Sequence, residues 1–422
     1  MNYKINKLSH INIISLVCAC IIPLLVTGPF LPDVIVSTLS LWFLYYSIKN
    51  KLYAVYKKFY FYAFVSFYFF CILSSLLSDN ILFSIKTSLF YIRIGLFSIL
   101  IFYIIEQNKK ILDYFYYTFL ITFSIIILDG YIQYFTGYNL IGYKLTIIES
   151  NILRVSSFFG DELILGSYLA RLFPLFFALF ISRIKKNPLE IYCISILFIL
   201  IDVLIFLSGE RSAFFFLNLS TLFIIILIKN YQKFRLVTFL IALLFTVIIT
   251  LNNQDIKNRM IMTPLKDLGL VEGYTKKNFF TPIHDSHIRT AFRMFLEKPI
   301  LGHGPKLFRV KCSDPKYVVG NWPCSTHPHN FYVQLLAETG IIGFSFLFSA
   351  FCFVIYSVFR QLKSIVLKQK RYLNDYQVCL LAGILISVWP FSPNGNFFNN
   401  WLSIVYTLPI GFYLHSIYEK TK

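Results

Sequence analysis

The sequence contains little charge. Only 14% of its residues are Asp, Glu, Lys or Arg, whereas 57% are hydrophobic, and a soluble domain carries about 25% charged residues. It also lacks a Gly-rich nucleotide loop, a Cys-x-x-Cys pair and the Gly-x-Ser-x-Gly turn of serine hydrolases. These absences argue against an ordinary soluble fold and against the chemistries that those motifs support.

Long apolar runs recur from end to end instead. A run of about 20 residues is long enough to cross a bilayer as a helix. The sequence therefore predicts an all-α polytopic membrane protein in a lipid bilayer, with about twelve transmembrane helices. The predicted spans are 11–31, 32–48, 59–78, 82–106, 111–136, 162–182, 189–208, 212–229, 235–252, 329–359, 374–391 and 398–418.

Basic residues gather on one side of these spans, for example around Lys58 and Lys363. The short connections on the other side hold only Lys144, Arg154 and Arg211. The positive-inside rule then places both termini in the cytoplasm. The net charge of +19 is better explained by this orientation than by binding to nucleic acid.

One long polar stretch, residues 253–328, interrupts the spans. We expect it to form a large, partly helical loop on the outer face, which is the periplasm in a Gram-negative cell. The chain is thus predicted to consist of helices 1–9 in residues 1–252, this loop, and helices 10–12 in residues 329–422, within a single integral membrane domain.

Two cysteines, Cys312 and Cys324, lie in the long loop, whereas the other six lie in predicted spans. An oxidising compartment would allow these two to form a disulfide, worth about 3 kcal/mol in the chain-entropy model. Two free thiols are the alternative.

The stretch "THPHN", residues 326–330, is typical of the start of a span. Pro328 suits the first helical position, which would place His329 in the first turn. The free N–H groups there attract phosphate, and the helix dipole favours a neutral imidazole. Gly340 and Gly343 would share the face of His329 and let another helix approach closely. A capping side chain is the alternative role for His329.

Glu338 follows His329 by nine residues, about half a revolution around a helix. It is therefore interpreted as a structural acid and not as a catalytic partner. An acid at that depth needs a partner, which we expect to be Arg171, Lys86 or Arg93.

Three arginines are candidates for phosphate binding. Arg289 and Arg293 lie one turn apart in "DSHIRTAFRMF", an amphipathic helix, where paired guanidiniums suit a phosphate. Arg211 lies in the short connection "SGERS", with Glu210 as its expected partner. The alternatives are arginines solvated by lipid headgroups and a headgroup anchor, respectively.

No metal site is predicted. Histidines lie close together in and directly after the long loop, but their spacing matches no zinc motif. They are His284, His287, His303, His327 and His329.

The motifs together resemble those of the O-antigen ligase and O-antigen polymerase-like family. His329-Asn330, nine intervening residues and Gly340-x-x-Gly343 are similar to the ligase signature. "PILGHGPKLF" resembles a further family segment, which follows a helix whose arginine corresponds to Arg289. "SGERSAFF" resembles the family's arginine-containing span boundary, with Arg211 as the match.

This resemblance implies a GT-C-like fold in the bacterial inner membrane and a glycan donor linked to undecaprenyl diphosphate. It implies a metal-independent, inverting transfer at the periplasmic face, without a cofactor. Arg211, Arg289 and Arg293 would then hold the diphosphate, and His329 would accept a proton from the acceptor hydroxyl or hold that hydroxyl in line.

Two reactions of the family compete. A ligase transfers the glycan to lipid A–core, which the spacing of His329 and Asn330 favours. A polymerase transfers it to a second lipid-linked repeat unit. Phe344, which stands where Gly, Thr or Tyr is usual in ligases, and the outer loop with Arg154 keep the polymerase open.

A transporter or lipid flippase is the alternative from another class. It would need repeated or broken helices and ionisable residues near the midplane of the membrane. No repeat is visible. The ionisable candidates are Lys86, Arg93, Arg171, Asp202 and Glu338.

Overall fold

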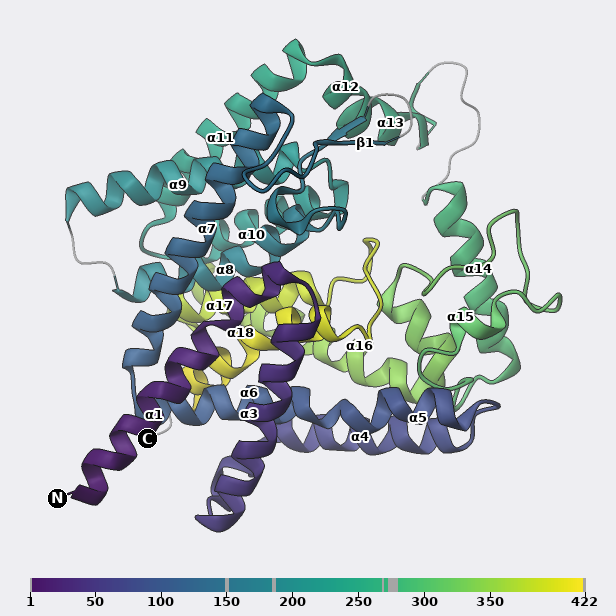
Figure 1. Ribbon diagram of the computed structural model, residues 1–422, viewed down its shortest axis with the longest axis horizontal. Helices are drawn as coiled ribbons and strands as arrows, with labels where there is room; N and C mark the ends of the chain where they lie inside the picture. Colours follow the sequence, from purple (N-terminus) through teal and green to yellow (C-terminus); the bar gives the residue numbers. More distant parts are fainter. Residues whose placement is uncertain (1, 149–151, 184–186, 268, 272–279, 420–422) are drawn as a thin grey trace.

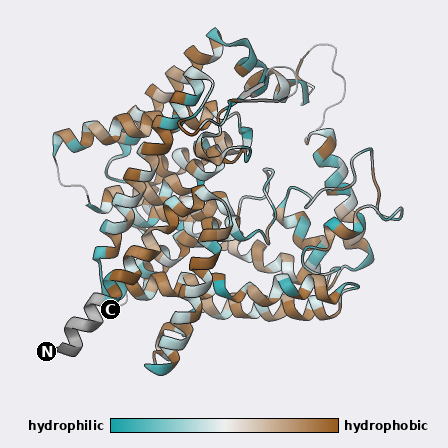
Figure 2. Ribbon diagram, viewed as in Figure 1, coloured by the Kyte–Doolittle hydropathy of each residue, from teal (hydrophilic) through white to brown (hydrophobic). Residues whose placement is uncertain are grey.

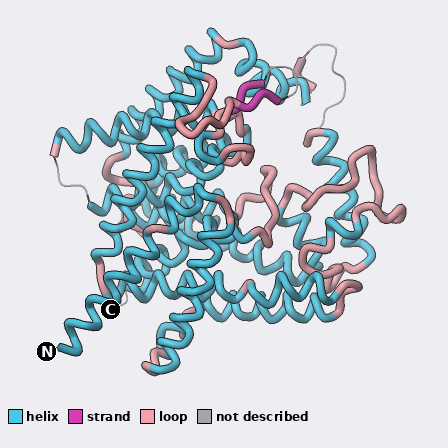
Figure 3. The backbone as a smooth tube through the Cα atoms, in the orientation of Figure 1, coloured by secondary structure: helices cyan, strands magenta, loops and turns pink. Residues whose placement is uncertain are grey.

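A computed structural model describes residues 2–148, 152–183, 187–267, 269–271 and 280–419. Residues 272–279, which belong to the predicted long loop, therefore lie outside the described part. The described chain is predominantly helical, as predicted, and its strands form one small antiparallel pair (Figure 3).

The first part of the chain builds most of the helical bundle (Figure 1). Its elements are α1 (Asn2–Ala19), α2 (Ile21–Leu24), η1 (Leu25–Thr27), α3 (Phe30–Lys49), η2 (Tyr53–Tyr56), α4 (Phe59–Leu76), α5 (Ile81–Phe90), α6 (Ile92–Gln107), α7 (Lys110–Thr136), β1 (Thr146–Ile148), β2 (Ile152–Arg154), η3 (Ser157–Phe159), α8 (Leu165–Arg183), α9 (Pro188–Leu207), α10 (Arg211–Leu227) and α11 (Gln232–Asn252).

The remainder contains the polar segment and the last long helices. Its elements are α12 (Gln254–Lys257), the π-helix η4 (Asn258–Met262), α13 (Thr263–Asp267), α14 (Pro282–Glu297), α15 (Phe308–Lys311), α16 (Phe331–Val366), α17 (Asp375–Ser387) and α18 (Asn400–Tyr418).

Each predicted span contains helix, but the count of twelve is not confirmed. Within the described ranges, nine stretches are long and apolar enough to cross a membrane. They contain α1 to η1, α3, α4, α5 with α6, α7, α8, α9, α11 and α16. The apolar helices α10 and α17 are shorter, and α18 is not among the nine.

Aromatic side chains fill the core of the bundle. Phe119 and Phe123 of α7 contact Phe176 of α8, with ring centroids 5.6 and 5.4 Å apart. Phe198 of α9 meets Phe176 edge to face at 5.7 Å. These aromatic contacts hold α7, α8 and α9 together, and Figure 2 shows the hydrophobic character of the surrounding bundle.

The beginning of the chain and its last helix lie at the same end of the bundle (Figure 1). Asn12 of α1 accepts a hydrogen bond from Asn108 at 2.6 Å, and the neighbouring Lys109 pairs with Glu419 at 2.5 Å. The even number of crossings in the predicted topology requires this arrangement.

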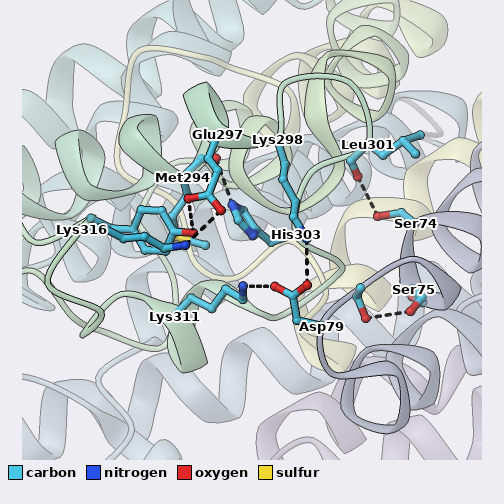
Figure 4. A network of polar contacts seen from close by, with 12 residues as sticks. Ser74, Ser75, Asp79, Met294, Glu297, Lys298, Leu301, His303, Lys311 and Lys316 are labelled. Carbon is cyan, nitrogen blue, oxygen red and sulfur yellow. Dashed lines mark hydrogen bonds and ion pairs between the residues drawn. The ribbon is translucent and has the colours of Figure 1, made fainter.

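The polar segment packs onto α4 and α5 (Figure 4). Asp79, which precedes α5, forms ion pairs with Lys298 at 2.9 Å and with Lys311. Ser74 of α4 donates a hydrogen bond to the carbonyl of Leu301 at 2.8 Å. These contacts fix the segment to the bundle at a point distant in sequence.

The predicted disulfide is present. Cys312 and Cys324 are bonded, with their Cα atoms 5.1 Å apart. The bond closes a loop between α15 and the stretch that enters α16.

A break at Gly340 divides α16, because this residue has φ +63° and ψ −166°. The segment after α14 packs into the break, where Ile341 donates its N–H to the carbonyl of Pro299 at 2.8 Å. The prediction that His329, Gly340 and Gly343 share one helical face is therefore wrong. Gly340 allows another part of the backbone to approach closely, as expected of a small residue, but that backbone belongs to a loop and not to a helix.

Candidate functional site

A cavity of about 1810 Å³ lies between the bundle and the polar segment. Its lining comes from α7, the loop before α8, the start of α10, η4, α13, the start of α14, the stretch before α16 and the loop after α17. Of the predicted site residues, His329 and Arg211 line it. The cavity therefore unites segments that are widely separated in the sequence.

His329 lies before the helix and not in its first turn. The helix begins at Phe331, and Asn330 is its cap: the Asn330 side chain accepts hydrogen bonds from the N–H groups of Tyr332 and Val333. His329 itself has φ +57°, a left-handed conformation that costs a non-glycine residue about 1–2 kcal/mol. The prediction of Pro328 as the first helical residue is thus wrong, because the asparagine side chain is the better cap.

The loop between α17 and α18 holds this strained stretch in place. Asn394 donates its N–H to the carbonyl of His329 at 2.8 Å, and its own carbonyl contacts Nε2 of His327 at 3.2 Å. Asn330 donates from Nδ2 to the carbonyl of Pro390 at 2.8 Å. Sequence reasoning missed this loop, although its "SPNGN" pattern at 392–396 is typical of a turn rich in polar groups.

Arg171 supports the same loop from inside the bundle. Its Nη2 donates to Oδ1 of Asn394 at 2.9 Å, and its guanidinium lies 4.4 Å from the ring centre of Phe216 and 4.6 Å from that of Tyr406. The buried arginine thus contacts a polar cavity wall, where a charge at this depth avoids lipid.

Three other imidazoles lie against the imidazole of His329. Its ring centre lies 4.1 Å from that of His327, 4.9 Å from that of His284 and 5.3 Å from that of His287. Burial, and then these three neighbours, lower the pKa of His329 to about 3. His329 is consequently neutral at physiological pH and can accept a proton or a hydrogen bond.

The remaining polar contact of His329 is local, with its Nε2 3.3 Å from Oγ of Ser325. His303, the fifth histidine of the region, has a different role: its Nε2 lies 3.0 Å from the carbonyl of Met294 inside a turn. Among the described residues, no group of three or more His, Cys, Asp or Glu side chains is arranged to hold a metal ion.

Glu338 holds the segment before α15 and has none of the cationic partners expected for it. Its Oε2 accepts the N–H of Lys306 at 2.9 Å, and its Oε1 accepts that of Phe308 at 3.0 Å. Gln334 donates to Oε2 at 2.9 Å. The structural role predicted for Glu338 is therefore confirmed, but backbone N–H groups and an amide satisfy it instead of arginine or lysine.

Glu210 does not pair with Arg211. Its Oε1 accepts the N–H of Gly166 at 2.7 Å, and its Oε2 accepts the N–H of Ser167 at 3.2 Å, so the carboxylate caps the start of α8. Arg211 instead lies 3.5 Å from Oδ2 of Asp267. The expected pairing of sequence neighbours fails because the free N–H groups of α8 are nearer to the carboxylate.

Two further arginines join Arg211, and we call Arg154, Arg211 and Arg259 the arginine group. Arg154 donates from Nε to the carbonyl of Ser208 at 3.1 Å, and Arg259 donates from Nε to the carbonyl of Gly209 at 3.2 Å. Burial, then Arg211 and Arg154, lower the pKa of Arg259 to about 10. The arginine group therefore presents concentrated positive charge to the cavity.

Arg289 and Arg293 do not line the cavity. Arg289 pairs with Asp285 at 2.8 Å, and 65% of its side chain is exposed. Arg293 donates to the carbonyl of Val318 at 2.9 Å. The amphipathic helix exists as α14, but its other face, with His284, is the one that reaches the cavity.

An apolar arm extends the cavity along α7. Ile121 and Ile125, which are 59% and 50% exposed, line this arm with Ile126. Pro23 and Val26, between α1 and α3, form the facing wall. The cavity is thus polar around the histidines and arginines and apolar within the spans.

A comparison with protein families matches this part of the chain. Residues 194–348 match a family model described as O-antigen ligase. In this region the chain is similar to O-antigen ligases. The matched region includes Arg211, Arg289, His329 and Gly340, and it indicates a glycosyltransferase-type enzyme of the membrane. No curated protein matches the chain.

Four of the five ionisable residues named for a transporter, Arg93, Arg171, Asp202 and Glu338, are engaged in structural contacts. Asp202 accepts from Arg235 at 2.8 and 3.1 Å inside the bundle, and Arg93 pairs with Asp33 at 2.7 Å. Together with the hydrogen bonds of Arg171 and Glu338, these ion pairs form a framework of structural contacts between charged side chains and the rest of the bundle. Such a framework favours the O-antigen ligase-like assignment over a proton or ion pathway.

Proposed function

We propose that the protein transfers an oligosaccharide or polysaccharide from undecaprenyl diphosphate to an acceptor hydroxyl at the periplasmic face of the inner membrane. The observation that carries the proposal is the composition of the cavity. It joins a neutral His329, the arginine group and an apolar arm along α7. A lipid-linked diphosphate sugar has matching parts: a sugar, two phosphates and a long apolar tail.

The arginine group supplies the charge that the donor needs. Arg211 would contact the diphosphate directly, since its only ion pair in the described chain, at 3.5 Å to Asp267, is long and partly exposed. Arg154 and Arg259 add charge from the same wall. Positive groups that are already in place stabilise the charge that develops on the leaving diphosphate. Arg289 and Arg293 lie outside the cavity, so they are not assigned to the diphosphate.

His329 would act on the acceptor. Its neutral imidazole takes the proton of the acceptor hydroxyl while that oxygen bonds to the anomeric carbon. The bond between this carbon and the diphosphate breaks, and its electron pair leaves with undecaprenyl diphosphate. Attack from the face opposite the leaving group inverts the anomeric centre. The proposed step needs no metal, because the arginine group provides the electrophilic charge.

The apolar arm would take the proximal part of the prenyl chain. Ile121 and Ile125 face outward from α7 within a span. A lipid tail that lies against them remains in the hydrocarbon region while its diphosphate reaches Arg211. This position of the tail explains why the cavity reaches so far along α7.

The proposal is tested with purified protein, undecaprenyl-diphosphate oligosaccharide and lipid A–core. One glycan block added to lipid A–core indicates the ligase, which the spacing of His329 and Asn330 favours, and growth of lipid-linked chains indicates the polymerase. His329→Ala should abolish transfer, whereas His10→Ala, an exposed histidine outside the cavity, should retain it. Full transfer by a folded His329→Ala protein would disprove the mechanism.

A further inference from the structure

Two more cations, Lys306 and Arg309, line the same cavity from another segment of the chain than the arginine group. We call them the second cationic pair. They belong to the segment around the start of α15, whereas the arginine group belongs to β2, α10 and η4. The ion pairs of the described part of the chain include neither side chain. The second cationic pair therefore has charge to offer to a ligand.

The backbone at Lys306 is held in a conformation that disfavours a side chain. Its φ is +62°, a region that glycine adopts freely and other residues rarely. Glu338 fixes this conformation by accepting the N–H groups of Lys306 and Phe308. Strained residues that the surroundings hold in place concentrate at functional sites. Among the lysines with positive φ, Lys306 is the one that lines the cavity in the described part of the chain.

Each cationic site influences one of the histidines that contact His329. Burial lowers the pKa of His284 and of His327 most, and beyond burial Arg211 acts on His284 whereas Arg309 acts on His327. His329 contacts both imidazoles. The group that would accept the proton thus contacts one imidazole that Arg211 influences and one that Arg309 influences.

We propose that Lys306 and Arg309 bind a phosphate of the acceptor glycan. The inference rests on the proposed glycosyl transfer. A diphosphate donor and an anionic acceptor repel each other in one cavity, so each needs its own counter-charge. The proposed function assigns the arginine group and the apolar lining of α7 to the donor, which leaves the second cationic pair for the acceptor.

The test measures KM for each substrate with Lys306→Gln, Arg309→Gln and the double variant. Loss of a charge-assisted hydrogen bond should raise the acceptor KM about tenfold or more, with the donor KM unchanged. Lys316→Gln is the matched control, because Lys316 is in the same segment, pairs with Glu297 at 3.0 Å and lies outside the cavity (Figure 4). Lys306→Arg retains the charge and should restore the acceptor KM.

Three acceptors distinguish the source of the phosphate: lipid A–core, lipid A–core stripped of phosphate, and a diphosphate-linked repeat unit. The parent protein should use the stripped acceptor poorly, and the double variant should no longer discriminate against it. An unchanged acceptor KM, or a rise in donor KM alone, would overturn the inference while transfer still required His329. Absence of transfer by the parent protein with every acceptor would instead overturn the proposed function, and this inference with it.

Discussion

The break in α16 makes Gly340→Ala the most informative substitution for the architecture. Gly340 combines φ +63° with ψ −166°, a region that is almost exclusive to glycine and costs other residues about 1–3 kcal/mol. An added Cβ would also lie 2.3 Å from the carbonyl oxygen and 2.4 Å from the carbonyl carbon of Ile300. Backbone cannot rotate away as a side chain can, so the loop before α15 must move.

The cost of that movement follows from the hydrogen bonds that it disturbs. Ile341 donates to Pro299 at 2.8 Å and His303 donates to Ala337 at 3.0 Å across the contact. At about 1 kcal/mol for each bond, added to the conformational term, Gly340→Ala should destabilise the protein by about 4 kcal/mol. The loop also carries Lys306, so transfer activity should fall in parallel.

Gly137→Ala is the matched control. Gly137 ends α7 with φ +83°, and a Cβ there would meet no atom within 4 Å. It therefore carries only the conformational cost of about 1–2 kcal/mol. In thermal unfolding of the detergent-solubilised proteins, Gly340→Ala should unfold several degrees below Gly137→Ala. Equal unfolding temperatures would refute the reasoning from backbone contact.

Three further outcomes are expected. The pKa of His329 is about 3 in the folded protein and about 6.5 in the unfolded chain, so the unfolded chain binds more protons between these two pH values. The free energy of unfolding should therefore fall as pH drops below about 6.5. A rate–pH profile that inflects near 6.5 because of His329 would contradict its neutral state. Replacing Cys312 and Cys324 with serine should cost about 3 kcal/mol and remove any effect of dithiothreitol on the unfolding temperature, and an unchanged unfolding temperature would count against the bond. Asp202→Asn should destabilise the bundle by about 3–5 kcal/mol because Arg235 would lose its buried partner, and a parent-like unfolding temperature would show that the pair is not needed.

The features that depend on local sequence were predicted well. Apolar runs long enough to cross a bilayer predicted a helical membrane protein, because backbone N–H and C=O groups in hydrocarbon must form hydrogen bonds within their own segment. The motif around His329 and Gly340 led to the resemblance to O-antigen ligases, which the match over residues 194–348 supports. The disulfide of Cys312 and Cys324 followed from their isolation in the polar segment.

Features that depend on contacts between distant segments were not predictable in the same way. Helical spacing predicts a shared face only within an unbroken helix. The predicted face with His329 and Gly340 was wrong because α16 begins after His329 and is broken at Gly340. The capping of α8 by Glu210 depends on the approach of α10, which lies 44 residues away in sequence. No pattern along the chain indicates such an approach.

The sequence by itself thus determined that the protein is a helical membrane protein and singled out His329, which lines the cavity. The tertiary structure alone decided which charges surround that imidazole. It brought Arg154, Arg259 and Lys306 to the cavity and left Arg289 and Arg293 outside it. The physical reason is that hydrophobicity and spacing act along the chain, whereas the field at a site sums charges through space, from segments that only packing brings together.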